Sequence, residues 1–192
     1  MKKKVFIIHR WHGNPKLDWY QWIKKELEKR NFEVIVPEMP NTDSPIIKDW
    51  VDHLKKLIIN LNEKDFFIAH SIGCQTVMRF LSIHSEKEKL GGIIFVAPWL
   101  KLKNLPKEEI EIAKPWLENP IDFKKIKSFT NKITCIFSDN DNYVPIENIT
   151  LFRKNLNAEI ITEKDKGHFS EDDGIKKVPE VLEKFLKISN GN

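Results

Sequence analysis

The sequence predicts an α/β fold in which helices cover both faces of a parallel sheet. Short runs rich in Val, Ile and Phe alternate with longer segments of helical period, which is typical of consecutive strand–helix–strand units. Hydrophobic residues make up 41% of the 192-residue chain, and the charged residues, 31%, are spread along it rather than gathered in tails. This composition is that of a globular protein, so we expect one domain, residues 1–192, built as a three-layer α/β/α sandwich.

Six short apolar runs are predicted as strands because they are rich in β-branched and aromatic residues and end at turn-forming or polar residues. In chain order they cover residues 4–9, 33–37, 65–69, 92–97, 133–138 and 158–162. Helical segments lie between them, so right-handed crossovers and a sheet of about six parallel strands are expected.

The helices are predicted from apolar residues that recur every three or four positions. The clearest pattern runs from Ile47 to Leu61, with Ser44 as the predicted N-cap and Pro45 as the first helical residue. The other helices are expected at residues 17–30, 72–84, 146–155 and 178–188.

The interval 98–131 breaks this alternation. It has no clear strand pattern, and it holds four prolines around one short helical pattern. Long connections of this kind in compact domains are often functional, so we expect an insertion over the strand ends that acts as a lid.

Charge and hydropathy argue against nucleic-acid and membrane partners. The net charge of +4 comes from 32 Lys and Arg against 28 Asp and Glu, and the longest basic run is Lys2–Lys4. A nucleic-acid surface usually carries a denser basic patch. No apolar run approaches the ~20 residues that span a bilayer, and the first residues, with a short apolar core and an early polar break, are not expected to act as a signal peptide. We therefore expect a cytoplasmic protein, with Cys74 and Cys135 as free buried thiols.

Four of the predicted strands are followed directly by polar residues suited to chemistry. The first is followed by HRWHG, the third by HSIG, the fifth by SDNDNYVP and the sixth by KGHF. Ligands of open parallel sheets bind at the carboxyl ends of the strands. A serine, an acid and a histidine are therefore expected together at one edge of the sheet.

Ser71 lies where a predicted strand turns at once into a helix, in FFIAHSIGCQTVMRFL (66–81). Such a turn can hold a serine on a strained elbow with its hydroxyl exposed, provided that the residues two before and two after are small. Those residues are Ala69 and Gly73, with alanine in place of the more usual first glycine. The alternative is that Ser71 only caps the helix.

A serine becomes a good nucleophile when a neutral imidazole takes its proton and a carboxylate orients that imidazole. The chain supplies Ser71, Asp141 and His168, in the order found in α/β-hydrolases. Asp139 is the rival acid, and the one not used would form a local turn. Asp141 is preferred because it stands three residues before the valine of a Val-Pro pair.

The loop after the first strand is predicted to supply one of two backbone N–H donors to an oxyanion. We assign these donors to Trp11 and Ile72. His9 and His12 could instead bind zinc, but no Cys or carboxylate partner lies near them in the sequence. No metal and no cofactor is expected.

Six tryptophans divide into two groups. Trp19, Trp22 and Trp50 fall on helix faces and are expected in the core, whereas the other three lie in loops or in the 98–131 interval. An apolar substrate pocket is therefore expected from Trp11, Trp99 and Trp116, with Arg10 and Phe169 beside it, and plain packing is the alternative.

The segments WYQWIKKELEKRNFEVIVPEMPNTDSPIIKDW, IAHSIGC, SDNDNYVP and KGHFSEDDG resemble the small serine hydrolases related to retinoblastoma-binding protein nine. The resemblance spans nearly the whole chain and implies a minimal α/β-hydrolase fold, with Ser71 as nucleophile, His168 as base and Asp141 as orienting acid. That family's first loop usually begins His-Gly, whereas this chain has His9-Arg10.

The expected function is hydrolysis of a small ester, thioester or amide through an acyl-enzyme on Ser71, with a small-molecule acyl substrate. The alternative is a protein-interaction module on the same scaffold, with a protein partner and little or no catalysis.

Overall fold

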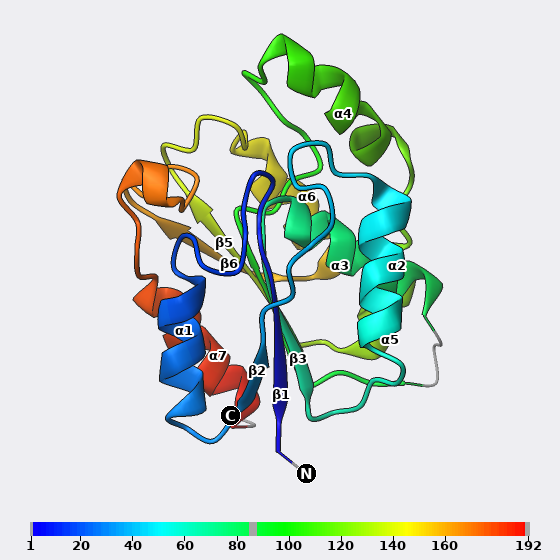
Figure 1. Ribbon diagram of the computed structural model, residues 1–192, viewed down its shortest axis with the longest axis vertical. Coiled ribbons are helices and arrows are strands. Elements are labelled where there is room, and N and C mark those ends of the chain that lie inside the picture. The colour runs from blue at the N-terminus through cyan, green and yellow to red at the C-terminus, as the bar shows by residue number, and fades with distance from the viewer. Residues whose placement is uncertain (1, 85–87, 191–192) are drawn as a thin grey trace.

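The computed structural model describes residues 2–84 and 88–190, and its centre is a six-stranded parallel sheet (Figure 1). The strands are β1 (Lys4–Ile8), β2 (Glu33–Ile35), β3 (Asp65–His70), β4 (Gly92–Val96), β5 (Ile133–Ser138) and β6 (Glu159–Glu163), in the spatial order β2-β1-β3-β4-β5-β6. All five pairings are parallel. The predicted strands are confirmed, with small differences at their ends.

Helices cover both faces of the sheet, as the α/β prediction requires. Helices α1 (Tyr20–Glu28) and α7 (Pro179–Ser189) pack against each other on one face. On the other face, α2 (Ile47–Leu57), α3 (Ile72–Ile83), α5 (Phe123–Phe129) and α6 (Glu147–Leu156) pack in succession. Helix α3 is buried along almost its whole length, so it belongs to the core rather than to the surface.

The predicted start of α2 is wrong by two residues. Ser44 does not cap the helix and Pro45 is not its first residue, because Ile46 is still extended and serves as the N-cap. The N–H of Ser44 instead donates to Asn41 in a turn, and the carbonyl of Pro45 accepts the indole N–H of Trp116. This tertiary hydrogen bond keeps the Ser-Pro segment outside the helix.

Two helices, rather than one, lie in the interval 98–131. Helix α4 (Lys107–Glu118) continues through Pro115, and α5 follows with Asp122 as its N-cap, whose side chain accepts the N–H of Lys125. Helix α5 packs on α3 and α6 and is part of the sandwich. Helix α4 stands apart at the upper end of Figure 1, so only the first part of the interval lies outside the sandwich, and its role as a lid stays a prediction.

The strands β3 and β4 are buried at every position and form the centre of the core. Trp19 and Trp50 are fully buried, and Trp22 packs against the core from a partly buried position, as predicted. Cys74 and Cys135 are free and buried.

The two ends of the described chain meet at the amino ends of the strands, away from α4. There the ammonium group of Lys3 donates to the carbonyl oxygen of Ser189 in the last turn of α7. Across the described residues, none of the helices has the length and apolar character needed to span a membrane.

Candidate active site

Ser71 occupies a strained turn between β3 and α3. Its backbone has φ 55° and ψ −119°, a conformation that is uncommon for a residue other than glycine. The helix passes so close to β1 that a Cβ atom on Gly73 would lie 2.5 Å from the carbonyl oxygen of Ile8. The side chain of Ser71 makes no capping hydrogen bond, so the simple capping interpretation does not hold.

The structure brings Ser71, His168 and Asp141 into one continuous chain of hydrogen bonds. The Nε2 atom of His168 lies 2.8 Å from Ser71 Oγ, and its Nδ1 atom lies 2.8 Å from Asp141 Oδ2. A carboxylate can only accept, so Nδ1 carries the imidazole proton and Nε2 is left as an acceptor for the serine hydroxyl.

Asp141 is held as a carboxylate at the end of this chain. Its side chain is buried, and burial alone would raise the pKa of the carboxyl group. The hydrogen bond from His168 and the N–H groups of Tyr143 and Val144, which donate to Asp141 Oδ1, outweigh burial and leave the pKa below its ordinary value. The acid therefore stays ionised while it orients the histidine.

The rival acid, Asp139, does not contact His168. Its Oδ1 accepts the N–H of Asp165, and the side chain of the next residue, Asn140, accepts the N–H of Gly167. Both bonds fasten the loop that carries His168 to the loop after β5. Asp139 therefore supports the loop and lies outside the hydrogen-bonded chain.

The His168 loop also depends on Asp173, which the sequence reasoning did not select. Asp173 Oδ2 accepts the N–H of His168 and both the N–H and the hydroxyl of Ser170. Gly167 is required there because a Cβ atom would collide with the Asp173 carboxylate, and its φ is +54°. The sequence pattern Ser170-x-x-Asp173 is a capping signal that could have pointed to this contact.

Two backbone N–H groups are available as oxyanion donors. Among the described residues, the N–H of Trp11 has no hydrogen-bond acceptor, whereas those of Arg10 and His12 are used by Tyr20 and Thr42. Ile72 is the first residue of α3, where an N–H has no acceptor within the helix. These are the two donors assigned from the sequence.

The peptide unit that joins Arg10 to Trp11 is held in place by hydrogen bonds to its carbonyl oxygen. The Arg10 carbonyl accepts the N–H of Gly13 and lies 2.9 Å from Nδ1 of buried His9. Met39 donates its N–H to Nε2 of the same imidazole, so His9 is neutral, with its proton on Nδ1. Because the two ends of a trans peptide unit point in opposite directions, these bonds also orient the Trp11 N–H.

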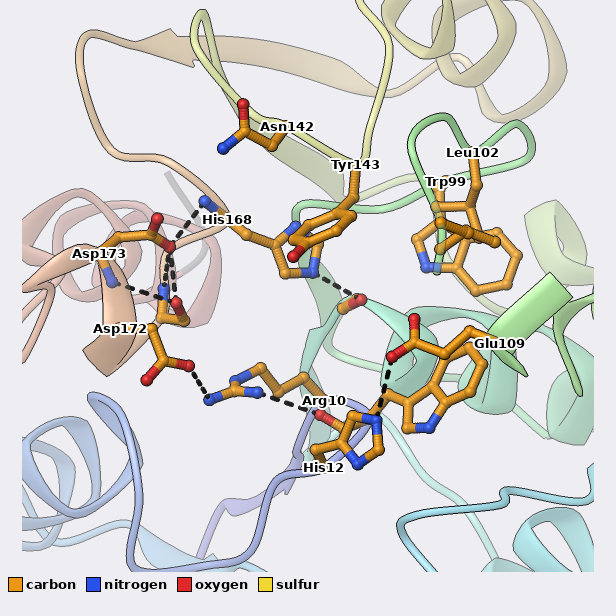
Figure 2. Close-up of a pocket in the computed structure, with 14 residues that line it drawn as sticks. Arg10, His12, Trp99, Leu102, Glu109, Asn142, Tyr143, His168, Asp172 and Asp173 are labelled. Atoms are coloured by element: carbon orange, nitrogen blue, oxygen red, sulfur yellow. Dashed lines mark hydrogen bonds and ion pairs between the residues drawn. The ribbon is translucent and has the colours of Figure 1, made fainter. Parts of the chain in front are cut away.

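A cavity of about 290 Å³ opens beside Ser71 and His168. In Figure 2, Trp99 and Leu102 lie to one side of His168, and Arg10 and Asp172 lie to the other. Its lining is apolar from Trp11, Trp99, Leu102, Leu105 and Tyr143, and polar from Arg10, His12, Ser71, Glu109, Asn142, His168, Ser170, Asp172 and Asp173.

The structure corrects the predicted pocket at two positions. Trp116, a residue of α4, does not line the cavity, because its side chain is buried with the ring in edge contact with Trp50 and the indole N–H donating to the Pro45 carbonyl. Phe169 is also absent from the lining, because its fully buried ring points into the core while its carbonyl accepts the indole N–H of Trp19. Both are packing residues.

Arg10 does line the cavity, but its guanidinium is turned to other partners. It forms an ion pair with buried Asp18 (2.8 Å) and a longer one with Asp172 (3.4 Å), which Figure 2 also shows. The arginine that replaces the family's usual glycine therefore has its charge offset by two carboxylates.

This fold, with a serine, a histidine and an aspartate joined at the carboxyl edge of a parallel sheet, is that of an α/β-hydrolase. The Serine hydrolase family matches residues 5–187, and the chain belongs to this family. The family resemblance seen in the sequence is confirmed.

Two relatives and one more distant structural neighbour are similar to this chain. YdeN of Bacillus subtilis (strain 168) is 30% identical over 183 residues, which cover 95% of this chain and 94% of YdeN. The crystal structure of the ydeN gene product matches with a TM-score of 0.89, covering 97% of this chain and 98% of that one. Serine hydrolase RBBP9 of Rattus norvegicus is 25% identical over 152 residues, 79% of this chain and 77% of RBBP9. Est1E from Butyrivibrio proteoclasticus, solved with ferulic acid bound, shares the fold at a TM-score of 0.65 and 16% identity, covering 95% and 89% of the two chains.

Proposed function

We propose that this serine hydrolase cleaves a small carboxylic ester, or a related thioester or amide, through an acyl-enzyme on Ser71. The observation that carries the proposal is the chain Ser71 Oγ, His168 and Asp141, with 2.8 Å at each step, beside a cavity of about 290 Å³. Pockets for drug-sized ligands start at about 300 Å³, so the cavity favours small acyl groups.

In the proposed acylation, Ser71 Oγ attacks the substrate carbonyl carbon while its proton moves to His168 Nε2. The charge that develops on the carbonyl oxygen is met by the N–H groups of Trp11 and Ile72. As the intermediate collapses, the bond to the leaving group breaks and His168 returns the proton to the departing alcohol, thiol or amine.

In deacylation, water takes the place of the leaving group. His168 accepts a proton from the water as its oxygen attacks the acyl carbon, and then returns that proton to Ser71 Oγ as the acid is released. Throughout both steps, Asp141 stays ionised, accepts the hydrogen bond from the Nδ1–H of His168 and stabilises the transient imidazolium. No step requires a metal or a redox cofactor.

A fluorophosphonate probe tests the proposal directly, because it reacts covalently with activated serines. The wild type should be labelled and Ser71→Ala should not, with both proteins melting at similar temperatures. Labelling of neither protein would contradict the catalytic proposal and favour an interaction role on the same scaffold. Equal labelling of both would mean that another residue is the nucleophile.

A further inference from the structure

The loops that carry Trp11 and His168 are joined by a chain of buried hydrogen bonds that the proposed chemistry does not use. The backbone N–H of Arg10 lies 3.1 Å from Tyr20 Oη, which lies 2.7 Å from Nδ1 of His70. Nε2 of His70 then lies 2.7 Å from the carbonyl oxygen of His168. Tyr20 and His70 are fully buried.

This series of hydrogen bonds allows only one arrangement of protons. The His168 carbonyl can only accept, so Nε2 of His70 carries the proton and Nδ1 accepts from the Tyr20 hydroxyl. The Tyr20 oxygen is then free to accept the N–H of Arg10. Burial first, and the neighbouring His168 second, lower the pKa of His70 to about 3, so the imidazole is neutral in this role.

The residues beside Tyr20 connect the same two loops. The indole N–H of Trp19 donates to the carbonyl of Phe169 (3.1 Å). Asp18 accepts both the guanidinium of Arg10 and, at 2.7 Å, the N–H of Glu171. Asp18 also adopts a left-handed backbone conformation (φ 54°) that is uncommon outside glycine. Residues 18–20 thus brace the oxyanion loop against the His168 loop.

We propose that Tyr20 and His70 are positioning residues of the hydrolase site. Through the N–H of Arg10 they fix the His9–Arg10 peptide unit, which is next to the unit that carries the Trp11 N–H, and through the His168 carbonyl they fix the base. Because His70 directly precedes Ser71, one rigid unit sets the positions of the nucleophile, the base and an oxyanion donor. This inference rests on the proposed function, and a misplacement of about 1 Å at such a site costs about 100-fold in rate.

Three variants separate the hydrogen bonds on the Arg10 side of His70 from the hydrogen bond on its His168 side. Tyr20→Phe removes only the hydroxyl. His70→Asn keeps an acceptor near the former Nδ1 and loses the donor to His168, whereas His70→Gln reaches His168 with its amide N–H and loses the acceptor for Tyr20. Thr134→Val is the matched control, because it removes a buried hydroxyl that is hydrogen-bonded to Glu159. Thr134 lies at the start of β5, at the amino ends of the strands and away from the cavity.

The readouts are kcat and KM on a p-nitrophenyl ester well below the melting temperature, and the NMR signal of the His168 Nδ1–H proton. Tyr20→Phe and His70→Asn should each lose about 10- to 100-fold in kcat, with KM changed by less than about twofold. Thr134→Val should keep its kcat. The His168 signal should shift or broaden in His70→Asn and stay in place in His70→Gln.

Equal kcat values in Tyr20→Phe, His70→Asn and the control would overturn the positioning role, as would losses that merely follow the melting temperatures. If the wild type neither hydrolyses esters nor reacts with fluorophosphonate, the proposed function fails first. In that case the His168 signal decides alone, and an unchanged signal in His70→Asn rejects the inference.

Discussion

Asp139 and Asp141 show how two identical side chains in one loop acquire different roles. The Asp141 carboxylate is buried, and it receives the imidazole N–H of His168 and two backbone N–H groups. Asp139 is exposed and receives one backbone N–H, from Asp165. The difference is one of position: only Asp141 is directed into the site, where a fixed negative charge can orient an imidazole.

Replacing each acid with asparagine should therefore give unequal losses. Asp141→Asn removes the charge and allows the wrong imidazole tautomer, so turnover should fall on the order of 10,000-fold, by analogy with the serine proteases. Asp139→Asn keeps an oxygen that can accept the N–H of Asp165, and its loss should stay below about tenfold. Turnover of both variants on one ester is the measurement. An active Asp141→Asn beside an inactive Asp139→Asn would reverse the assignment.

At the scale of elements, α4 is attached much more firmly at its C-terminal end than at its N-terminal end. The buried guanidinium of Arg79, on α3, donates to the carbonyls of Trp116 and Asn119, where the negative end of the helix dipole favours a cation. Burial lowers the pKa of Arg79 to about 10, so it remains charged at neutral pH. At the other end, the side chain of Glu109 reaches His12 at 3.3 Å on the rim of the cavity.

Trp116 should accordingly affect stability rather than substrate choice. Trp116→Ala deletes a fully buried ring, and such truncations lower the free energy of unfolding by about 3–5 kcal/mol. Rates on short and long acyl esters should fall together, if at all. Leu105→Ala is the contrasting variant, because Leu105 is partly exposed and lines the cavity, so the ranking of the same esters should change. A changed ranking in Trp116→Ala alone would return this residue to the pocket.

At the scale of the whole molecule, the sequence was sufficient for the sheet and for the residues that meet at its edge. Strand patterns and the polar residues after each strand are local signals, and parallel topology then brings Ser71, Asp141 and His168 together. The directions of side chains in loops were not predictable. Phe169, in a loop, and Trp116, on α4, are both buried, and they form hydrogen bonds with Trp19 and Pro45, which are distant from them in sequence. His70 and Tyr20 were missed for the same reason.

The buried histidines should make unfolding easier in mild acid. Burial lowers the pKa of His70 to about 3 and also lowers that of His9. In the unfolded chain both imidazoles ionise near about 6.5, so below that pH the unfolded state binds protons that the folded state does not. The free energy of unfolding should fall between about pH 7 and about pH 5, by up to about 1.4 kcal/mol per pH unit for each histidine.

Urea unfolding at several pH values measures this slope. His70→Gln removes one of the two groups, so its slope should be smaller than that of the wild type, whatever its absolute stability. The lowered pKa of Asp141 acts in the same direction, but its stabilising effect is lost only in stronger acid, below the ordinary range of a carboxyl group. Identical slopes in the two proteins would show that His70 binds protons in the folded state as it does in the unfolded chain, which contradicts its burial as a neutral imidazole.

The bond between Lys3 and the end of α7 has a practical consequence for handling the protein. It places the first strand's start and the last helix's end side by side, at the edge of the sheet opposite the cavity (Figure 1). A surface tether, a fluorophore or a fused domain attached near Lys3 or near the end of α7 would therefore lie on the side of the molecule away from the cavity. Ser71 would still face the solution. Immobilised on a bead through either of these positions, the protein should leave its cavity open to compounds in the surrounding solution.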